Sequence, residues 1–284
     1  MPKEITVVKA SGEREPFSEA KLRRSLERAH TSPDVIDTVI AEVESGLREG
    51  MRTSEIYSEA FSLLRRLHRP TAARYHLKRA LMELGPTGHP FEKLVGELLK
   101  SEGFEVGVAR IVHGVCVKHE VDVVGTKGDR HIMLECKYHN QSGIKSDVKV
   151  ALYVQARFED VERQWQKQPG HAEKFHEAWL VTNTKLTSDA VAYAECVKMR
   201  AIGWAYPRDA GLESMIERAH LHPITCLTTL PASLKRELLD RGLVLCKDIL
   251  RADALLKSVG LNEQKIVTVI REAEEMLQLA HGSG

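Results

Sequence analysis

Two acidic residues and a lysine are the side chains in this sequence whose types and spacing best suit chemistry. Glu135, Cys136 and Lys137 are consecutive, and Asp122 precedes Glu135 with twelve residues between them. In a β-strand, residues i and i+2 share a face, so Glu135 and Lys137 point to the same side. If residues 126–129 form the turn of a hairpin, Asp122 joins them at one edge of the core.

This set of side chains favours metal-dependent phosphodiester hydrolysis. Two carboxylates suit a hard divalent cation such as Mg²⁺ or Mn²⁺, and Mg²⁺ keeps several of its waters. A lysine beside them can orient or deprotonate an attacking water. Hydrolysis of a phosphodiester needs charge neutralisation on the phosphoryl oxygens and a positioned nucleophile. The pattern therefore predicts catalytic roles for Asp122, Glu135 and Lys137. The alternative is a surface strand whose polar side chains merely face solvent.

The elements that must position these residues follow a clear boundary at residues 85–90, where Gly and Pro cluster. Beyond it, alternation typical of strands is interleaved with the longer period of helices. This order predicts an α/β layer rather than a β-sandwich. The expected elements are a helix that ends at Gly103, strands over 115–123 and 131–138, a helix over 147–166, a strand over 178–182, a helix over 188–199 and a strand over 201–205.

The central segment resembles the PD-(D/E)xK nuclease superfamily and, within it, the Mrr-like restriction endonuclease domain. The resemblance covers roughly residues 89–207 and depends on HPFEKLVGELLKSEGFEV, EVDVVG, HIMLECKYHN and WLVTNTKLTSDAVAYAECVKMRAIGW. It implies that Asp122 and Glu135 are metal ligands and that Lys137 is the catalytic lysine. Glu92, the acidic residue of the first helix, would be the third metal-site residue, with Glu97 as an adjacent rival. Gln155 is a weaker candidate in the later helix.

The segment before residue 85 predicts a short hairpin and then four helices, the last beginning at Pro70. It resembles the ATP-cone, a regulatory nucleotide-binding module, through VVKASGEREPF, SEAKLRRSLERA, the helix start TSEI and the ending TAARYHLKRAL.

The ATP-cone resemblance implies a nucleotide site built from Val8, Lys9, Lys21 and Thr53. The lysines would meet phosphates, the backbone near Val8 would read the adenine edge, and Thr53 would contact the nucleotide from a helix start. These modules usually carry a second basic residue after the lysine, where this chain has Ala10. The alternative is a cone that is purely structural or an oligomerisation surface. No G-x-x-x-x-G-K-[ST] motif is present, so we do not expect a motor ATPase.

The C-terminal segment from about residue 222 predicts short amphipathic helices and resembles helix-hairpin-helix modules of the kind that end the polymerase alpha subunit. Val259-Gly260-Leu261-Asn262 stands where that family has h-G-h-G. The resemblance implies that Gly260, Asn262 and Lys265 contact DNA phosphates through a helix start. A hairpin that contacts protein instead is the alternative.

Composition and charge exclude several classes of protein for this chain. The chain has 284 residues, is 43% hydrophobic and 29% charged, and has 41 Lys and Arg against 40 Asp and Glu, so no basic field spans the whole protein. No uninterrupted apolar run is long enough for a membrane helix, so we expect a cytoplasmic protein without a membrane partner. The cysteines form no C-x-x-C pair, and no H-E-x-x-H is present, which argues against a disulfide framework and zinc catalysis. We expect buried free thiols and core tryptophans: Cys116, Cys136, Cys196, Cys226 and Cys246; Trp165, Trp179 and Trp204.

Together these features predict a multidomain α and α/β protein with domains at 1–85, 89–208 and 222–284. The expected activity is Mg²⁺- or Mn²⁺-dependent hydrolysis of DNA, adjusted by ATP or dATP on the cone, in a homo-oligomer. One alternative is a nucleotide-sensing DNA-binding regulator with a non-catalytic nuclease-like core. Another is a structure-specific nuclease of DNA repair or recombination.

Overall fold

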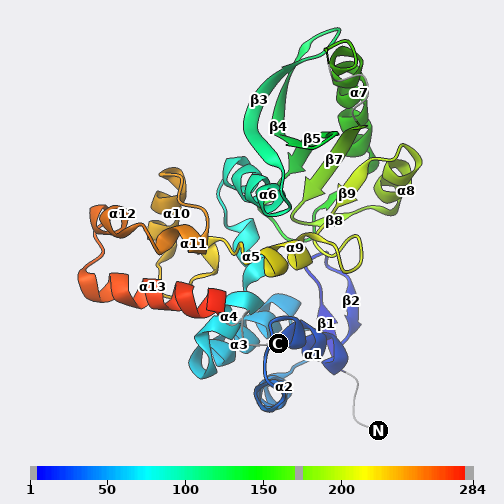
Figure 1. Ribbon diagram of the computed structural model, residues 1–284. Helices are drawn as coiled ribbons and strands as arrows, with labels where there is room; N and C mark the ends of the chain where they lie inside the picture. Colours follow the sequence, from blue (N-terminus) through cyan, green and yellow to red (C-terminus); the bar gives the residue numbers. More distant parts are fainter. Residues whose placement is uncertain (1–4, 170–174, 279–284) are drawn as a thin grey trace. The chain divides into compact units, whose positions relative to one another are not determined.

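The computed structural model describes residues 5–169 and 175–278, and the chain divides into two compact units (Figure 1). The first unit joins Met1–Ala80 to Ile224–Glu237 and Cys246–Gly284. The second unit joins Leu81–Pro223 to Leu238–Leu245. Much of the C-terminal segment therefore belongs to the same unit as the N-terminal segment.

The second unit is built on a mixed five-stranded sheet in the order β3-β4-β5-β7-β9. Strands β3, β4 and β5 are antiparallel, whereas β5, β7 and β9 run parallel to one another. The multidomain α and α/β fold expected from the sequence is confirmed. The strand bounds are Glu105–His113, Lys118–Lys127, Arg130–Lys137, Phe175–Thr182 and Arg200–Ile202.

Helices cover both faces of this sheet. Helix α6, His89–Ser101, packs on the face that holds Phe104 and the fully buried Trp179, whose rings meet edge to face. Helices α7, Val148–Trp165, and α8, Ser188–Cys196, cover the opposite face in one cluster with Met133 and Leu180. The sheet thus has a buried core on each side, which holds its strands rigidly. Two short strands, β6 (Lys145–Ser146) and β8 (Lys185–Leu186), pair separately, and helix α9 spans Leu212–Ala219.

The first unit begins with a hairpin, β1 (Thr6–Val8) and β2 (Arg14–Pro16), followed by helices. The single helix expected to begin at Pro70 is two helices, α4 and α5, separated at His76. The helices here are α1 (Glu19–Arg28), α2 (Pro33–Gly46), α3 (Thr53–Leu67), α4 (Arg69–Tyr75) and α5 (Leu77–Met82).

The C-terminal segment adds α10 (Ala232–Asp240), α11 (Cys246–Ile249), α12 (Asp253–Ser258) and α13 (Glu263–Gln278), after a short 3₁₀ turn at Ile224–Cys226. Helix α13 packs against α4, and the buried Arg74 donates from Nη2 to the carbonyl oxygen of Met276 at 3.0 Å. Thr225 donates to the carbonyl oxygen of Ala80 at 2.8 Å. These bonds join sequence-distant parts of the first unit.

The sequence prediction was wrong about one strand. It missed β3 and placed a strand over 115–123, whereas Val115 and Val117 lie in the β3–β4 turn and are exposed. Val115 and Val117 continue the alternation of β4 into the turn, and no Pro or pair of glycines marks where the strand begins. The sequence pattern therefore did not reveal this turn. Strand β9 ends at Ile202, earlier than expected.

The expectation of buried cysteines holds only in part. Cys226 and Cys246 are buried, Cys136 is half-buried, and Cys116 and Cys196 are exposed. The three tryptophans do lie in the core. No helix among the described residues is long and apolar enough to cross a membrane.

Candidate functional site

The hairpin of β4 and β5 places Asp122 and Glu135 next to each other. Val123 pairs with Leu134, so Asp122 and Glu135 each lie one residue beyond the same cross-strand pair. Both side chains are half-buried. Asp122 Oδ2 accepts a hydrogen bond from the backbone N–H of Cys136 at 2.7 Å, which fixes that carboxylate against β5. The hairpin expected here is present, but its turn is shorter than the predicted 126–129: Thr126 and Lys127 still pair with His131 and Arg130, and only residues 128–129 form the turn.

The surroundings of Asp122 disfavour its charge. Burial, and then the neighbouring Glu135, raise the pKa of Asp122 to about 7, although the Cys136 N–H acts in the opposite direction. Glu92 adds to the same rise. Such mutual repulsion between carboxylates is the condition that a bound cation relieves.

Glu135 is held by an arginine that the sequence analysis missed. Arg157, on α7, is buried and forms an ion pair with Glu135 Oε2, and it also donates to the carbonyl oxygen of Glu120. Burial raises the pKa of Glu135, while Arg157 and then Lys137 lower it. The signal was present in the sequence, since Arg157 lies on the buried stripe of α7 between Val154 and Val161. A cation on an apolar stripe requires a partner.

The other candidates lie around this pair. Glu92 lies in the first turn of α6, and its Oε2 lies 3.2 Å from Nδ1 of His89. Its charge raises the pKa of both Asp122 and Glu135, whereas its rival Glu97 pairs with Lys100.

Lys137 lies on the same strand as Glu135, and Gln155 lies on α7. Lys137 ends β5 with an exposed side chain, and its charge lowers the pKa of Glu135. Gln155 donates to Glu159 on its own helix, and its buried Oε1 has no partner among the described residues.

The donor set fits a divalent cation that keeps several waters. Hydrogen bonds occupy Oδ2 of Asp122 and Oε2 of Glu135, and within the described residues Oδ1 and Oε1 have no hydrogen-bond partner. Over residues 5–169 and 175–278, no three His, Cys, Asp or Glu side chains stand together as a ready metal cage. Two carboxylate oxygens plus waters match the way Mg²⁺ is usually held in proteins.

A buried polar network fixes the chain just beyond Lys137. Asn183 accepts from the backbone N–H of His139 at 2.9 Å and donates to its carbonyl oxygen at 2.7 Å. His139 Nε2 meets Ser146 Oγ at 3.1 Å, and Ser146 bonds to Thr182 at 3.2 Å. Burial, and then Lys137, lower the pKa of His139. The network ties the end of β5 to the end of β7 and so limits where Lys137 can lie.

The four residues expected to bind nucleotide gather around the first hairpin. Lys9 and Lys21 each contact Glu15 Oε2 at 2.8 Å. Val8 forms a parallel bridge with Arg52, the residue before Thr53 at the start of α3. The lysine hydrogen bonds lower the pKa of Glu15, Lys21 having the larger effect. The two cations therefore meet at one carboxylate.

The tail candidates lie in the connection between α12 and α13. Gly260 has φ +86°, a left-handed conformation that favours glycine. Asn262 is the N-terminal cap of α13, and its Oδ1 accepts from the backbone N–H of Lys265 at 2.9 Å. That N–H is thus used inside the protein, and the exposed side chain of Lys265 is the group left to face a ligand.

Comparison with protein families matches three successive parts of the chain. They are an ATP cone domain over residues 5–81, a restriction endonuclease domain of the Mrr type over residues 85–202, and an AF1548-like C-terminal domain over residues 222–277. The fusion expected from the sequence is confirmed: a restriction-endonuclease-like α/β domain follows an ATP-cone.

The chain belongs to the AF1548-like family. An uncharacterized protein of Archaeoglobus fulgidus is 38% identical over 184 residues, which are 64% of this chain and 99% of that protein. A crystal structure of the protein of unknown function AF1548 is 36% identical, covers 69% of this chain and 100% of its own, and has a TM-score of 0.55. MspJI restriction endonuclease, solved with a 27-mer oligonucleotide, is 12% identical over 79% of this chain and 44% of its own, at a TM-score of 0.27.

Proposed function

We propose that this protein is a DNA endonuclease that depends on Mg²⁺ or Mn²⁺ and that responds to ATP or dATP on its cone. The observation that supports this most is the pair of adjacent, half-buried carboxylates, Asp122 and Glu135, on the hairpin of a restriction-endonuclease-type sheet. Each keeps one oxygen without a hydrogen-bond partner among the described residues. Lys137 stands two residues beyond Glu135 on the same strand.

The chemistry divides among these side chains. Asp122 and Glu135 would hold the cation, and Glu92 would strengthen the negative field from α6. When bound, Mg²⁺ supplies positive charge to the phosphoryl oxygens. Lys137 would donate hydrogen bonds to the attacking water or to the phosphate, and its position is limited by the network around Asn183. Arg157 orients Glu135 from α7.

The direct test is nicking of a supercoiled plasmid by the full chain with Mg²⁺ or Mn²⁺, with EDTA as control, and with or without ATP or dATP. We expect open-circular DNA only when the metal is present and a change in rate with nucleotide. Metal-independent nicking, or none at any metal concentration, would contradict the proposal.

The ion pair between Arg157 and Glu135 favours a second candidate, a nucleotide-sensing DNA-binding regulator with a non-catalytic nuclease-like core. In that case the guanidinium takes the place of a cation beside Glu135. The regulator predicts a different result from the nuclease. DNA binding should persist in EDTA and respond to ATP or dATP, and no cleavage should accompany it.

A further inference from the structure

A pocket in the first unit is lined by three arginines that neither the proposed active site nor the proposed nucleotide site uses. It has a volume of about 640 Å³ and is lined by Arg65, Arg66, Leu67, Arg69, Thr228, Thr229 and Thr268. All of these residues belong to the first unit. Its volume falls within the roughly 300–1,000 Å³ typical of ligand sites.

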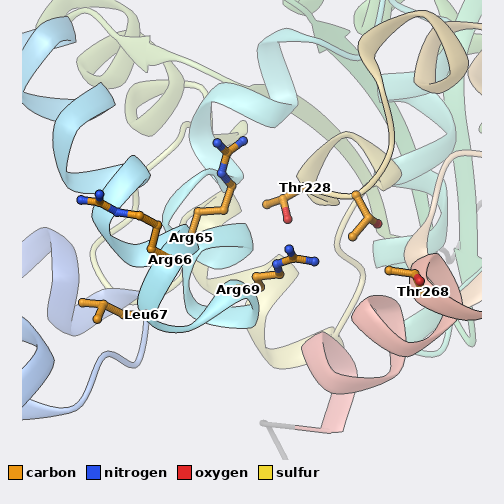
Figure 2. A pocket seen from close by; sticks show the side chains of 7 residues that line it. Arg65, Arg66, Leu67, Arg69, Thr228 and Thr268 are labelled. Carbon is orange, nitrogen blue, oxygen red and sulfur yellow. The ribbon is translucent and has the colours of Figure 1, made fainter. Parts of the chain in front are cut away.

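The arginines come from the junction of two helices. Arg65 lies in the last turn of α3 and Arg69 begins α4, and both side chains are exposed. Figure 2 shows Arg69 extending between Thr228 and Thr268 and Arg65 on the side of the threonines, whereas Arg66 points away from them. Within the described residues, none of the three arginines forms an ion pair or a side-chain hydrogen bond.

The acidic residue behind this pocket is already satisfied. The buried Glu272 accepts from the backbone N–H and hydroxyl of Thr228 at 2.7 and 2.6 Å. It also accepts from the N–H of Thr229 at 2.9 Å and from its hydroxyl at 2.5 Å. The hydroxyl of Thr268 donates to the carbonyl oxygen of Gln264 at 2.8 Å. The threonines therefore form a wall, and the guanidinium groups supply the free donors.

The pocket walls are held together from within. Arg74 bonds to the backbone of α13, and Thr225 bonds to the backbone of Ala80. Glu272 on α13 holds the loop that carries Thr228 and Thr229. A site whose walls are fixed in this way binds a ligand with less loss of conformational freedom.

We propose that Arg65 and Arg69 bind a phosphate group in this pocket. A planar guanidinium donates two parallel hydrogen bonds to phosphate oxygens, which a point charge cannot do. Like charges that converge without an acidic partner repel one another, and an anion removes that repulsion. Two sources share this chemistry, the polyphosphate of a free nucleotide and the backbone of DNA. The inference does not require that the second unit cleaves DNA.

The test uses the full chain and the double variant Arg65→Ala, Arg69→Ala, with Arg24→Ala as control. Arg24 is an exposed arginine on α1 whose Nε donates to the carbonyl oxygen of Ala20 on the same helix. Inorganic tripolyphosphate is titrated calorimetrically, and a fluorescent 20-base-pair duplex is titrated by anisotropy at several salt concentrations. We expect the double variant to lose roughly 10- to 100-fold in affinity for at least one ligand. The control should stay within about twofold.

The same measurements distinguish a free nucleotide from the DNA backbone as the source of the bound phosphate. Loss of tripolyphosphate affinity alone indicates a nucleotide-type ligand. Loss of duplex affinity, with a salt slope reduced by about one for each lost phosphate contact, indicates the DNA backbone. Unchanged affinity for both ligands, relative to Arg24→Ala, overturns the proposal.

Binding at the proposed nucleotide site must be kept apart from binding at the pocket. The titrations are therefore repeated in a chain that carries Lys9→Ala and Lys21→Ala. The loss caused by the arginine substitutions should persist there. If it disappears in this background, the arginines acted through the nucleotide site, and the pocket proposal is overturned.

Discussion

At the scale of single residues, we propose that the two carboxylates on the β4–β5 hairpin hold the catalytic cation. Asp122→Ala and Glu135→Ala should each weaken Mn²⁺ binding more than about tenfold and reduce nicking roughly 100-fold or more, because each removes one of the two oxygens free to ligate. Calorimetry with Mn²⁺ and plasmid nicking are the measurements. Asp129→Ala, in the exposed turn of the same hairpin, is the matched control.

Lys137→Met separates rate from metal affinity. A lysine that acts on water or phosphate should lose rate and leave Mn²⁺ affinity within about twofold. Equal losses of both would make Lys137 a structural residue. Wild-type activity in either carboxylate variant would contradict the assignment of the metal site.

The next prediction concerns the two lysines of the proposed nucleotide site. Because Glu15 holds both Lys9 and Lys21, a phosphate must compete with it. Glu15→Gln should therefore tighten ATP binding roughly two- to tenfold, as expected from the small energy of exposed ion pairs. Isothermal titration measures this, with Glu19→Gln, the partner of Arg23, as control. Weaker ATP binding would mean that Glu15 positions the lysines.

At the scale of elements, Asp160 ties α7 to the β3–β4 turn. It accepts from the backbone N–H of Cys116 at 2.8 Å and of Val117 at 3.2 Å, and meets His119 Nε2 at 2.9 Å. A Cβ added at Gly114 would lie 2.0 Å from its Oδ2, so this close approach needs glycine. The bond from His119, and then those from the turn, hold the pKa of Asp160 well below its ordinary 3.8.

A carboxylate with a depressed folded-state pKa contributes stability above its unfolded pKa and loses it as pH falls through the folded value. Asp160→Asn should therefore lower the free energy of unfolding at neutral pH and flatten its decline below about pH 4. Urea unfolding across that range is the measurement, with Asp129→Asn as control. Parallel curves for wild type and variant would show that Asp160 is not responsible for this pH dependence.

A second element-scale prediction concerns α13 in the first unit. Glu272 receives four hydrogen bonds from Thr228 and Thr229 while buried. Glu272→Ala should cost about 2–4 kcal/mol of stability, because four donors lose their acceptor. Denaturant unfolding tests this, with Glu274→Ala on the exposed side of the same helix as control. A loss equal to that of Glu274→Ala would contradict it.

At the scale of the whole molecule, the ATP-cone and the nuclease-like sheet belong to different compact units. Nucleotide on the cone can alter cleavage only through its differential affinity for two states of the protein. With a coupling of about 1–3 kcal/mol, ATP should change nicking roughly 5- to 150-fold. Lys9→Ala and Lys21→Ala should each abolish this response and leave basal nicking intact. A persistent response in both variants would place the nucleotide elsewhere.

The sequence by itself determined what depends on local pairing. Asp122 and Glu135 could be placed side by side because a hairpin with a short turn sets its own register, and strand alternation then sets the faces. The same reasoning held for the hairpin that carries Val8 and Lys9. The multidomain α and α/β fold also followed from the order of periodic segments.

The tertiary structure alone decided what depends on packing between distant segments. Arg157 reaches Glu135 from another element, and the arginines near residue 65 meet threonines near residue 228 only because α13 packs on α4. Strand β3 escaped notice because its alternation is interrupted at Ala109, with φ +49°, and its partners are set by the sheet. Local patterns carry no record of such contacts, since their energy comes from surfaces that meet only after folding.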